Sequence, residues 1–206
     1  MVTPLCKKST QALNYFARKK DGRINKMKAV KLIYFADRYH LRKYGRPVVG
    51  DTYWAMKLGP VASNVLDTAN FDEKKLDDAC LGYAKSFLSH PVNDEKMHTL
   101  TSKKDVDLDV FSKSDIEALE TAYNEFGDKD QFELADIILH SYPEWAKHKN
   151  EIFEQGKKRV KMDYMDFFLD SKGAKSSGVF ELPEEHLDLS KGIYLENKET
   201  ESLLER

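Results

Sequence analysis

The sequence predicts a mainly α-helical fold with a small antiparallel β element (α+β), arranged as a compact helical globule around one central apolar helix. Two observations support this prediction. The composition, 41% apolar and 33% charged over 206 residues, favours a soluble, helix-rich protein with one well-buried core. Residues 25–44 are apolar around most of their helical circumference, which is typical of a helix at the centre of a core.

Two helices are predicted in the first third of the chain. Residues 9–20 carry apolar side chains at helical spacing and stop near Asp21-Gly22. The second helix follows Asn25, whose side chain suits an N-cap, and ends at Gly45, a residue type that favours the position after a helix. We therefore expect the central helix to occupy residues 25–44.

An extended segment with two aromatic residues follows the central helix. Residues 52–57 predict a short strand, and residues 97–101 alternate loosely enough to be a candidate pairing partner for it. Gly59-Pro60 predicts a turn with Pro60 in the first turn of a new helix, where its missing N–H costs nothing. These residues would form the small β element.

Capping signals mark later helices and a change of composition marks the end of the domain. Ser112 with Asp115, and Asp130 with Glu133, have the spacing of capping boxes ahead of apolar runs. Residues 171–178 have linker composition. We expect a domain over 1–170 and, over 171–206, a linker and C-terminal extension that either docks or stays partly disordered.

The net charge of −2 hides an asymmetry. Residues 1–50 carry 13 Lys/Arg against two acids, a balance of +11, while the other 156 residues carry 20 basic and 33 acidic groups, a balance of −13. A basic first quarter on an acidic body predicts either an acidic partner or docking of the two parts onto each other. A basic region interleaved with tyrosines would also suit nucleic acid, but these aromatics sit at core spacing and the pI of about 6.3 argues against that reading.

The expected environment is the cytoplasm. No run approaches the roughly 20 apolar residues that span a membrane, and the N-terminus lacks a secretory apolar region. Cys6 and Cys80 lie 74 positions apart without a CxxC pattern, so we expect ordinary reduced thiols.

A compact catalytic or metal-binding signature is absent from the sequence. It contains no phosphate-binding glycine loop and no HExxH, so we predict no cofactor and no metal. His40, within the central helix, is expected to be a satisfied, partly buried histidine. Asp37 is expected to be a structural anchor that needs an arginine or a backbone donor. A catalytic triad assembled in space from distant segments stays open.

Three motifs in order, LIYFADRYHL, YGRPV and YWAMKLGPV, resemble the Panacea (SocA-like) antitoxin family of bacteria and phages. The resemblance implies a non-enzymatic, mostly helical antitoxin that neutralises a cognate toxin protein by direct binding. In one branch of the family the antitoxin is an adaptor that delivers the toxin to a protease, and a nucleic-acid-binding regulator is the other alternative. The signature positions carried over are Tyr34, Phe35, Gly45, Trp54, Gly59 and Pro60.

The partner contact is predicted at the basic end of the central helix and at the short strand. An edge strand with an exposed lysine and an exposed tyrosine face is a natural docking element. The hypothesised partner-binding residues are Arg42, Lys43, Arg46, Tyr53 and Lys57.

Overall fold

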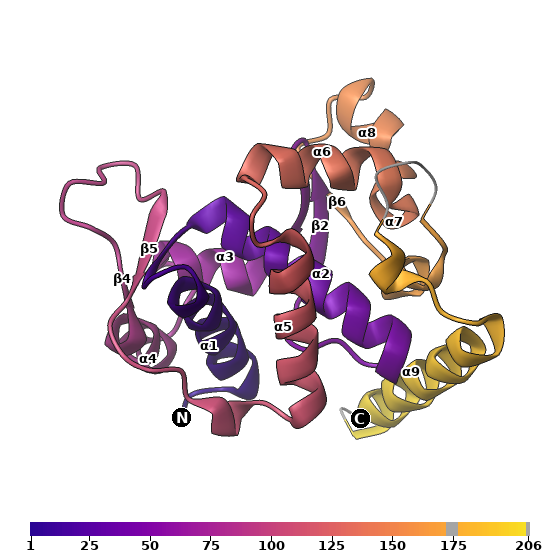
Figure 1. The fold of residues 1–206 in the computed structure, drawn as a ribbon, viewed down its shortest axis with the longest axis horizontal. Helices are drawn as coiled ribbons and strands as arrows, with labels where there is room; N and C mark the ends of the chain where they lie inside the picture. The colour runs from indigo at the N-terminus through magenta and orange to yellow at the C-terminus, as the bar shows by residue number, and fades with distance from the viewer. Residues whose placement is uncertain (172–176, 205–206) are drawn as a thin grey trace.

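The computed structural model describes residues 1–171 and 177–204 (Figure 1). Its elements follow the chain as α1 (Pro4–Lys19), β1 (Arg23–Asn25), α2 (Lys26–Tyr44), β2 (Tyr53–Met56), β3 (Gly59–Ala62), α3 (Ser63–Asn70), α4 (Asp78–Phe87), β4 (Leu88–Ser89), β5 (Thr99–Ser102), η1 (Leu108–Val110), α5 (Lys113–Phe126), α6 (Gln131–Ser141), α7 (Pro143–Ala146), α8 (Lys149–Phe153), β6 (Val160–Lys161), η2 (Tyr164–Phe168), η3 (Gly178–Phe180) and α9 (Glu184–Leu204). The mainly helical fold with small antiparallel sheets is confirmed. None of the described helices has the length and apolar content that a membrane crossing requires.

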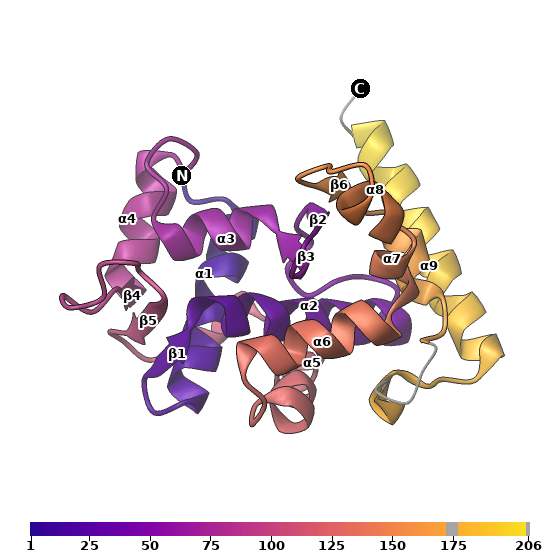
Figure 2. The same ribbon diagram turned by 90° about the horizontal axis from the view of Figure 1, so that it is seen from above.

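The predicted central helix is α2. Asn25 caps it by accepting a hydrogen bond from the Lys28 N–H at 3.1 Å, and Gly45 ends it in the left-handed conformation with φ of 70°. In Figure 2, α2 lies between the β2–β3 hairpin on one side and α5 and α6 on the other. Because elements cover it on several sides, most of its side chains are buried, including the signature residues Tyr34 and Phe35.

The strands form two small antiparallel sheets, in the orders β1-β5-β4 and β3-β2-β6. The predicted pairing of residues 97–101 with 52–57 is wrong, because β5 pairs with β1 and places Leu100 opposite Ile24. The neighbours of β2 are instead β3, which follows it through a two-residue turn, and β6. A hairpin partner so close in sequence closes at little entropic cost, and periodicity alone does not reveal it.

Pro60 lies in a strand, so the prediction that it begins a helix is wrong. It is opposite Ala55 in the β2–β3 hairpin, and the helix α3 begins only at Ser63. β3 is an edge strand of its sheet, where a residue without an N–H is tolerated. Gly59 has φ of 106°, a conformation that favours glycine.

The C-terminal extension contains a helix that packs on α2. A Cβ at Gly45 would lie 2.5 Å from the Ser190 carbonyl oxygen and 2.7 Å from the Ile193 Cβ, so α9 crosses directly over the end of α2. His186 Nε2 and Ser190 Oγ both approach the Lys43 carbonyl oxygen, at 2.8 and 3.1 Å. Of the predicted linker, residues 172–176 lie outside the described part of the chain.

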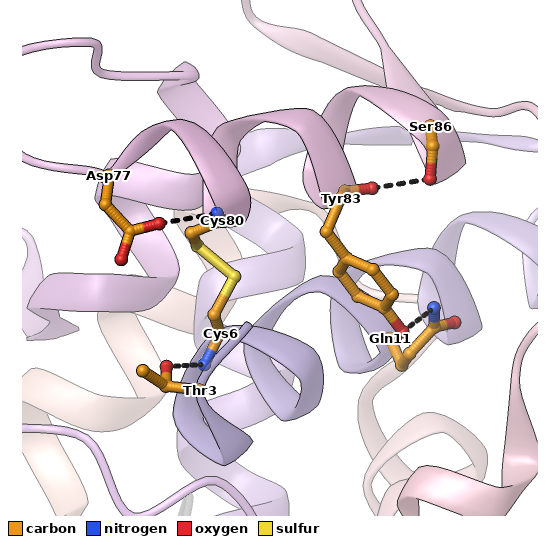
Figure 3. Close-up of a disulfide and its surroundings, with 7 residues drawn as sticks. All are labelled: Thr3, Cys6, Gln11, Asp77, Cys80, Tyr83 and Ser86. Carbon is orange, nitrogen blue, oxygen red and sulfur yellow. Dashed lines mark hydrogen bonds between the residues drawn. A yellow bond between two sulfur atoms is a disulfide. The ribbon is translucent and has the colours of Figure 1, made fainter. Parts of the chain in front are cut away.

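A disulfide joins Cys6 and Cys80, so the expectation of two reduced thiols is wrong (Figure 3). The two helices that carry them, α1 and α4, pack together and bring the Cα atoms within 5.9 Å, a normal separation for a bridge. Figure 3 also shows the hydrogen bond between Gln11 Nε2 and the Tyr83 hydroxyl, 2.8 Å long, between the same helices. A spacing of 74 residues gives no hint of this contact in the sequence.

We expect replacement of both cysteines by serine to lower the free energy of unfolding by about 2–4 kcal/mol. The bridge closes a loop of 74 residues, which restricts the unfolded chain far more than the folded one. Urea unfolding of the wild-type protein with and without reductant, compared with the double-serine variant, measures the effect. Equal midpoints for all three samples would contradict the prediction.

Candidate partner-binding surface

Arg42, the first residue of the hypothesised contact, is almost completely buried. Its guanidinium donates hydrogen bonds to the backbone carbonyls of residues 167–169 and of Phe180, and forms a salt bridge of 2.6 Å with Asp170. All of these partners lie in the segment that follows β6. Arg42 therefore ties α2 to the C-terminal part of the protein and does not face solvent.

Lys43 and Arg46 are half-buried and already paired with acids of α5. Lys43 Nζ lies 2.6 Å from Glu117 Oε1, and the Tyr44 hydroxyl donates to the same carboxylate at 2.7 Å. Hydrogen bonds from Lys43 and then from Tyr44 lower the pKa of Glu117 to about 2. Arg46 Nη1 lies 2.8 Å from Asp115 Oδ1. Lys43 and Arg46 therefore form salt bridges within the chain.

Many of the basic residues in the first quarter of the chain are neutralised by acidic residues from later parts of the same chain. Seven of the 13 basic residues in 1–50 form salt bridges with acids between Asp105 and Asp170. Of the two explanations offered by the sequence, docking of the basic and acidic parts onto each other accounts for these pairs. The seven are Lys8, Arg18, Lys19, Arg38, Arg42, Lys43 and Arg46.

Tyr53 and Lys57, the hypothesised residues of the short strand, have opposite environments. Tyr53 is buried, and its hydroxyl donates a hydrogen bond of 2.9 Å to Asp37 Oδ2. Lys57 is exposed in the turn between β2 and β3. The prediction of an edge strand is wrong, because β2 is the middle strand of its sheet and pairs with β3 and β6. Of the five hypothesised residues, Lys57 is thus the one that the structure leaves on an open surface.

Lys57 belongs to a groove of about 510 Å³ between α2 and the β2–β3 hairpin. Its floor is apolar, and four lysines are its only charged lining residues in the described part of the chain. The apolar lining residues are Met27, Val30, Met56, Leu58, Pro60, Val61 and Leu66, and the lysines are Lys26, Lys31, Lys57 and Lys158.

The β2–β3 hairpin forms one wall of this groove, and two side chains donate hydrogen bonds to its backbone carbonyls. Trp145 of α7, fully buried, donates its indole N–H to the Met56 carbonyl at 2.9 Å. Lys31 of α2 donates from Nζ to the Leu58 carbonyl. Burial lowers the pKa of Lys31 to about 8. A Cβ on Gly59 would approach the Lys31 Nζ to 3.0 Å, so glycine leaves room for this contact.

The signature residues have mostly structural surroundings. Tyr34 and Phe35 lie in the aromatic core, and Gly45 provides the close approach of α9. Trp54 is half-buried on the hairpin, with the Arg159 guanidinium 4.2 Å from its ring centroid. The sequence argument missed Arg159, because nothing local connects a basic residue after α8 with an aromatic residue in β2.

Asp37 and His40, the residues weighed for chemistry, are both buried and hydrogen-bonded to structural groups. Asp37 accepts hydrogen bonds from the Tyr53 hydroxyl and, at 2.8 Å, from the Val49 N–H, which is the backbone donor that the sequence argument required. His40 contacts the Arg46 carbonyl through Nδ1 at 2.6 Å and Ser114 Oγ through Nε2 at 2.9 Å. Within the described residues, no group of three His, Cys, Asp or Glu side chains could hold a metal ion.

The Asp37→Asn variant should gain stability relative to wild type as the pH rises from about 4 to about 7. Burial raises the pKa of Asp37 to about 7, from an unfolded value near 4, so the folded state binds more protons in this window and wild-type stability falls with rising pH. Asparagine resembles the protonated form and removes this loss, which we expect to be about 3 kcal/mol between pH 4.5 and pH 7.5. Urea unfolding at pH 4.5 and pH 7.5 measures the difference in the free energy of unfolding between the variant and the wild type. The same difference at both pH values would contradict the prediction.

Comparison with known families identifies a family that this chain resembles over much of its length. A model of the family described as antitoxin SocA-like, Panacea domain, matches residues 30–146, more than half of the chain. The match runs from the first half of α2 to the end of α7 and therefore includes the β2–β3 hairpin. No curated protein and no solved structure matches the chain.

Proposed function

This chain belongs to the SocA-like antitoxin family, which is defined by the Panacea domain, and we propose that it neutralises a cognate toxin protein by binding it directly. The family match over residues 30–146 is the observation that carries the proposal. We place this interaction in the cytoplasm, with the toxin encoded by a neighbouring gene. Residues 1–170 are the proposed antitoxin domain, and residues 171–206 are its C-terminal extension.

A binding role without catalysis agrees with the surroundings of the reactive side chains. Asp37 and His40 are inaccessible to a substrate and are occupied by hydrogen bonds that fix α2 to its neighbours. A largely apolar groove lies instead against the β2–β3 hairpin, whose turn is exposed, and such a groove is a feature of protein-binding surfaces. We therefore propose that the antitoxin acts by occupying a surface of the toxin.

Co-expression with the product of the neighbouring open reading frame tests the proposal. We expect the antitoxin to restore growth of cells that express the toxin, and the two proteins to co-purify in a fixed stoichiometry. Growth without a complex, or a complex without restored growth, would contradict direct neutralisation. The amount of toxin in the rescued cells distinguishes blocking, which leaves it constant, from delivery to a protease, which lowers it.

A control for nucleic acid belongs to the same experiment. If rescue depended on repression through DNA or RNA, the purified protein would bind nucleic acid with an affinity that falls steeply with salt. We expect no such binding, because salt bridges within the chain already engage much of the basic first quarter.

A further inference from the structure

We propose that the groove between α2 and the β2–β3 hairpin binds an amphipathic, acidic segment of the toxin. Apolar side chains of that segment lie on the groove floor, and its carboxylates meet the lysines at the rim. The inference rests on the proposed antitoxin function and adds the surface and the chemistry of the contact. Lys57 and Leu58, in the hairpin turn, are its central residues.

The apolar surface continues out of the groove. Leu58 is 50% exposed at the hairpin turn, next to the apolar side chains of α2, β3 and α3 that line the floor. A volume of about 510 Å³ accommodates a few anchoring side chains, such as those at positions i, i+3 and i+4 of a helix. A segment that crosses the turn covers both the groove and Leu58.

None of the lysines that line the groove forms a salt bridge within the described residues. Lys26 Nζ bonds to the side-chain oxygen of Asn70 at 2.5 Å, and Lys31 Nζ to a backbone carbonyl. Among the described residues, no salt bridge involves either of them, or the exposed Lys57 and Lys158. At the other end of α2, Arg42, Lys43 and Arg46 are all paired with acids. The exposed Lys57 and Lys158 therefore keep a positive field at the groove, which favours an acidic occupant.

The groove is formed before any partner arrives. The hairpin wall is fixed by the hydrogen bonds from Trp145 and Lys31 to its carbonyl oxygens, and the opposite wall is the first two turns of α2. A fixed surface loses little conformational entropy on binding, so more of the contact energy appears as affinity. A fatty-acid anion shares the apolar and acidic chemistry, and the cross-linking experiment below distinguishes it from a protein segment.

Charge reversal at the exposed rim tests the proposal. We expect Lys57→Glu with Lys158→Glu to weaken binding to the neighbouring gene's product about tenfold at low salt, chiefly through the association rate, and less at high salt. The matched control, Lys7→Glu with Lys113→Glu, changes the net charge equally on exposed lysines of α1 and α5. Its affinity should stay within about twofold of wild type.

A second pair of variants tests the apolar contact without altering the core. Leu58→Ser should also weaken binding about tenfold, whereas Leu108→Ser, at a leucine of 49% exposure in η1, should not. Urea unfolding verifies that all variants keep wild-type stability. If the groove variants bind and rescue as the wild type does, the inference is wrong while the antitoxin function stands. If the wild-type protein itself does not bind the neighbouring product, both are wrong.

Cross-linking identifies the occupant. A benzophenone amino acid in place of Leu58, in the full-length protein co-expressed with the neighbouring gene, should cross-link under light to a toxin segment with apolar residues flanked by Asp or Glu. The same group in place of Leu108 is the control and should give no such product. Cross-links that map to a basic segment, or only to lipid, would overturn the proposal.

Discussion

Glu144→Ala should lower the free energy of unfolding by about 3–5 kcal/mol, because it leaves a buried arginine without its counter-charge. Arg38 and Glu144 form a salt bridge of 2.5 Å, and both side chains are 0% exposed. The Tyr34 hydroxyl donates to the same carboxylate oxygen, so the substitution also removes that acceptor. The guanidinium lies 4.7 Å from the centre of the Tyr142 ring and cannot reach water without repacking the core. Urea unfolding at neutral pH measures the loss.

An exposed salt bridge provides the control. Lys85 and Glu73 lie 3.0 Å apart with side chains 47% and 71% exposed, so Glu73→Ala should cost less than about 1 kcal/mol. Glu144→Gln keeps a hydrogen-bond acceptor but not the charge, and we expect an intermediate loss. If Glu144→Ala were as stable as Glu73→Ala, the pair would contribute nothing to the stability of α2 and α7.

Phe35→Ala should cost about 3–5 kcal/mol, since it empties the middle of the aromatic core. Phe35 is completely buried, its ring stacks on Phe126 at 3.8 Å between centroids, and Tyr142 and Phe180 close around it. The substitution leaves a cavity between α2, α5 and η3. Chemical denaturation gives the loss directly.

The matched variant is Phe132→Ala on α6, where the ring is 61% exposed. Its truncation should change stability by less than about 1 kcal/mol. A loss under 1 kcal/mol for Phe35→Ala would show that α2 is not the centre of the core.

The sequence predicted the features that depend on neighbouring residues. The N-cap at Asn25, the left-handed Gly45 and both capping boxes form as predicted, because each needs only residues within one helical turn. Strand pairing depends on which segments the helices bring together, and there the prediction was wrong for residues 97–101. The same holds for the disulfide, which follows from the packing of α1 against α4.

The candidate contact was predictable only in part, because the partners of its charges are distant in sequence. Arg42 was expected to face a partner but is buried on α2 like Arg38, and their partners Asp170 and Glu144 are more than 100 residues away in sequence. Charge reversal at Arg42 would thus unfold the protein and could not report on a partner. Lys57 is exposed as expected, but it lies in the turn between β2 and β3 and not in the strand to which the sequence assigned it.

The disulfide gives the chain a topology that survives unfolding. Residues 6–80 form a covalently closed ring that contains α2, the β2–β3 hairpin and α3. A protease that threads unfolded chains from one end would reach a point where it must pull two segments through its pore side by side. Because Cys6 and Cys80 are both largely buried, separation of α1 and α4 makes the bridge more accessible to reductant. We expect such a protease to degrade the wild type more slowly than the double-serine variant, which pulse–chase degradation would measure.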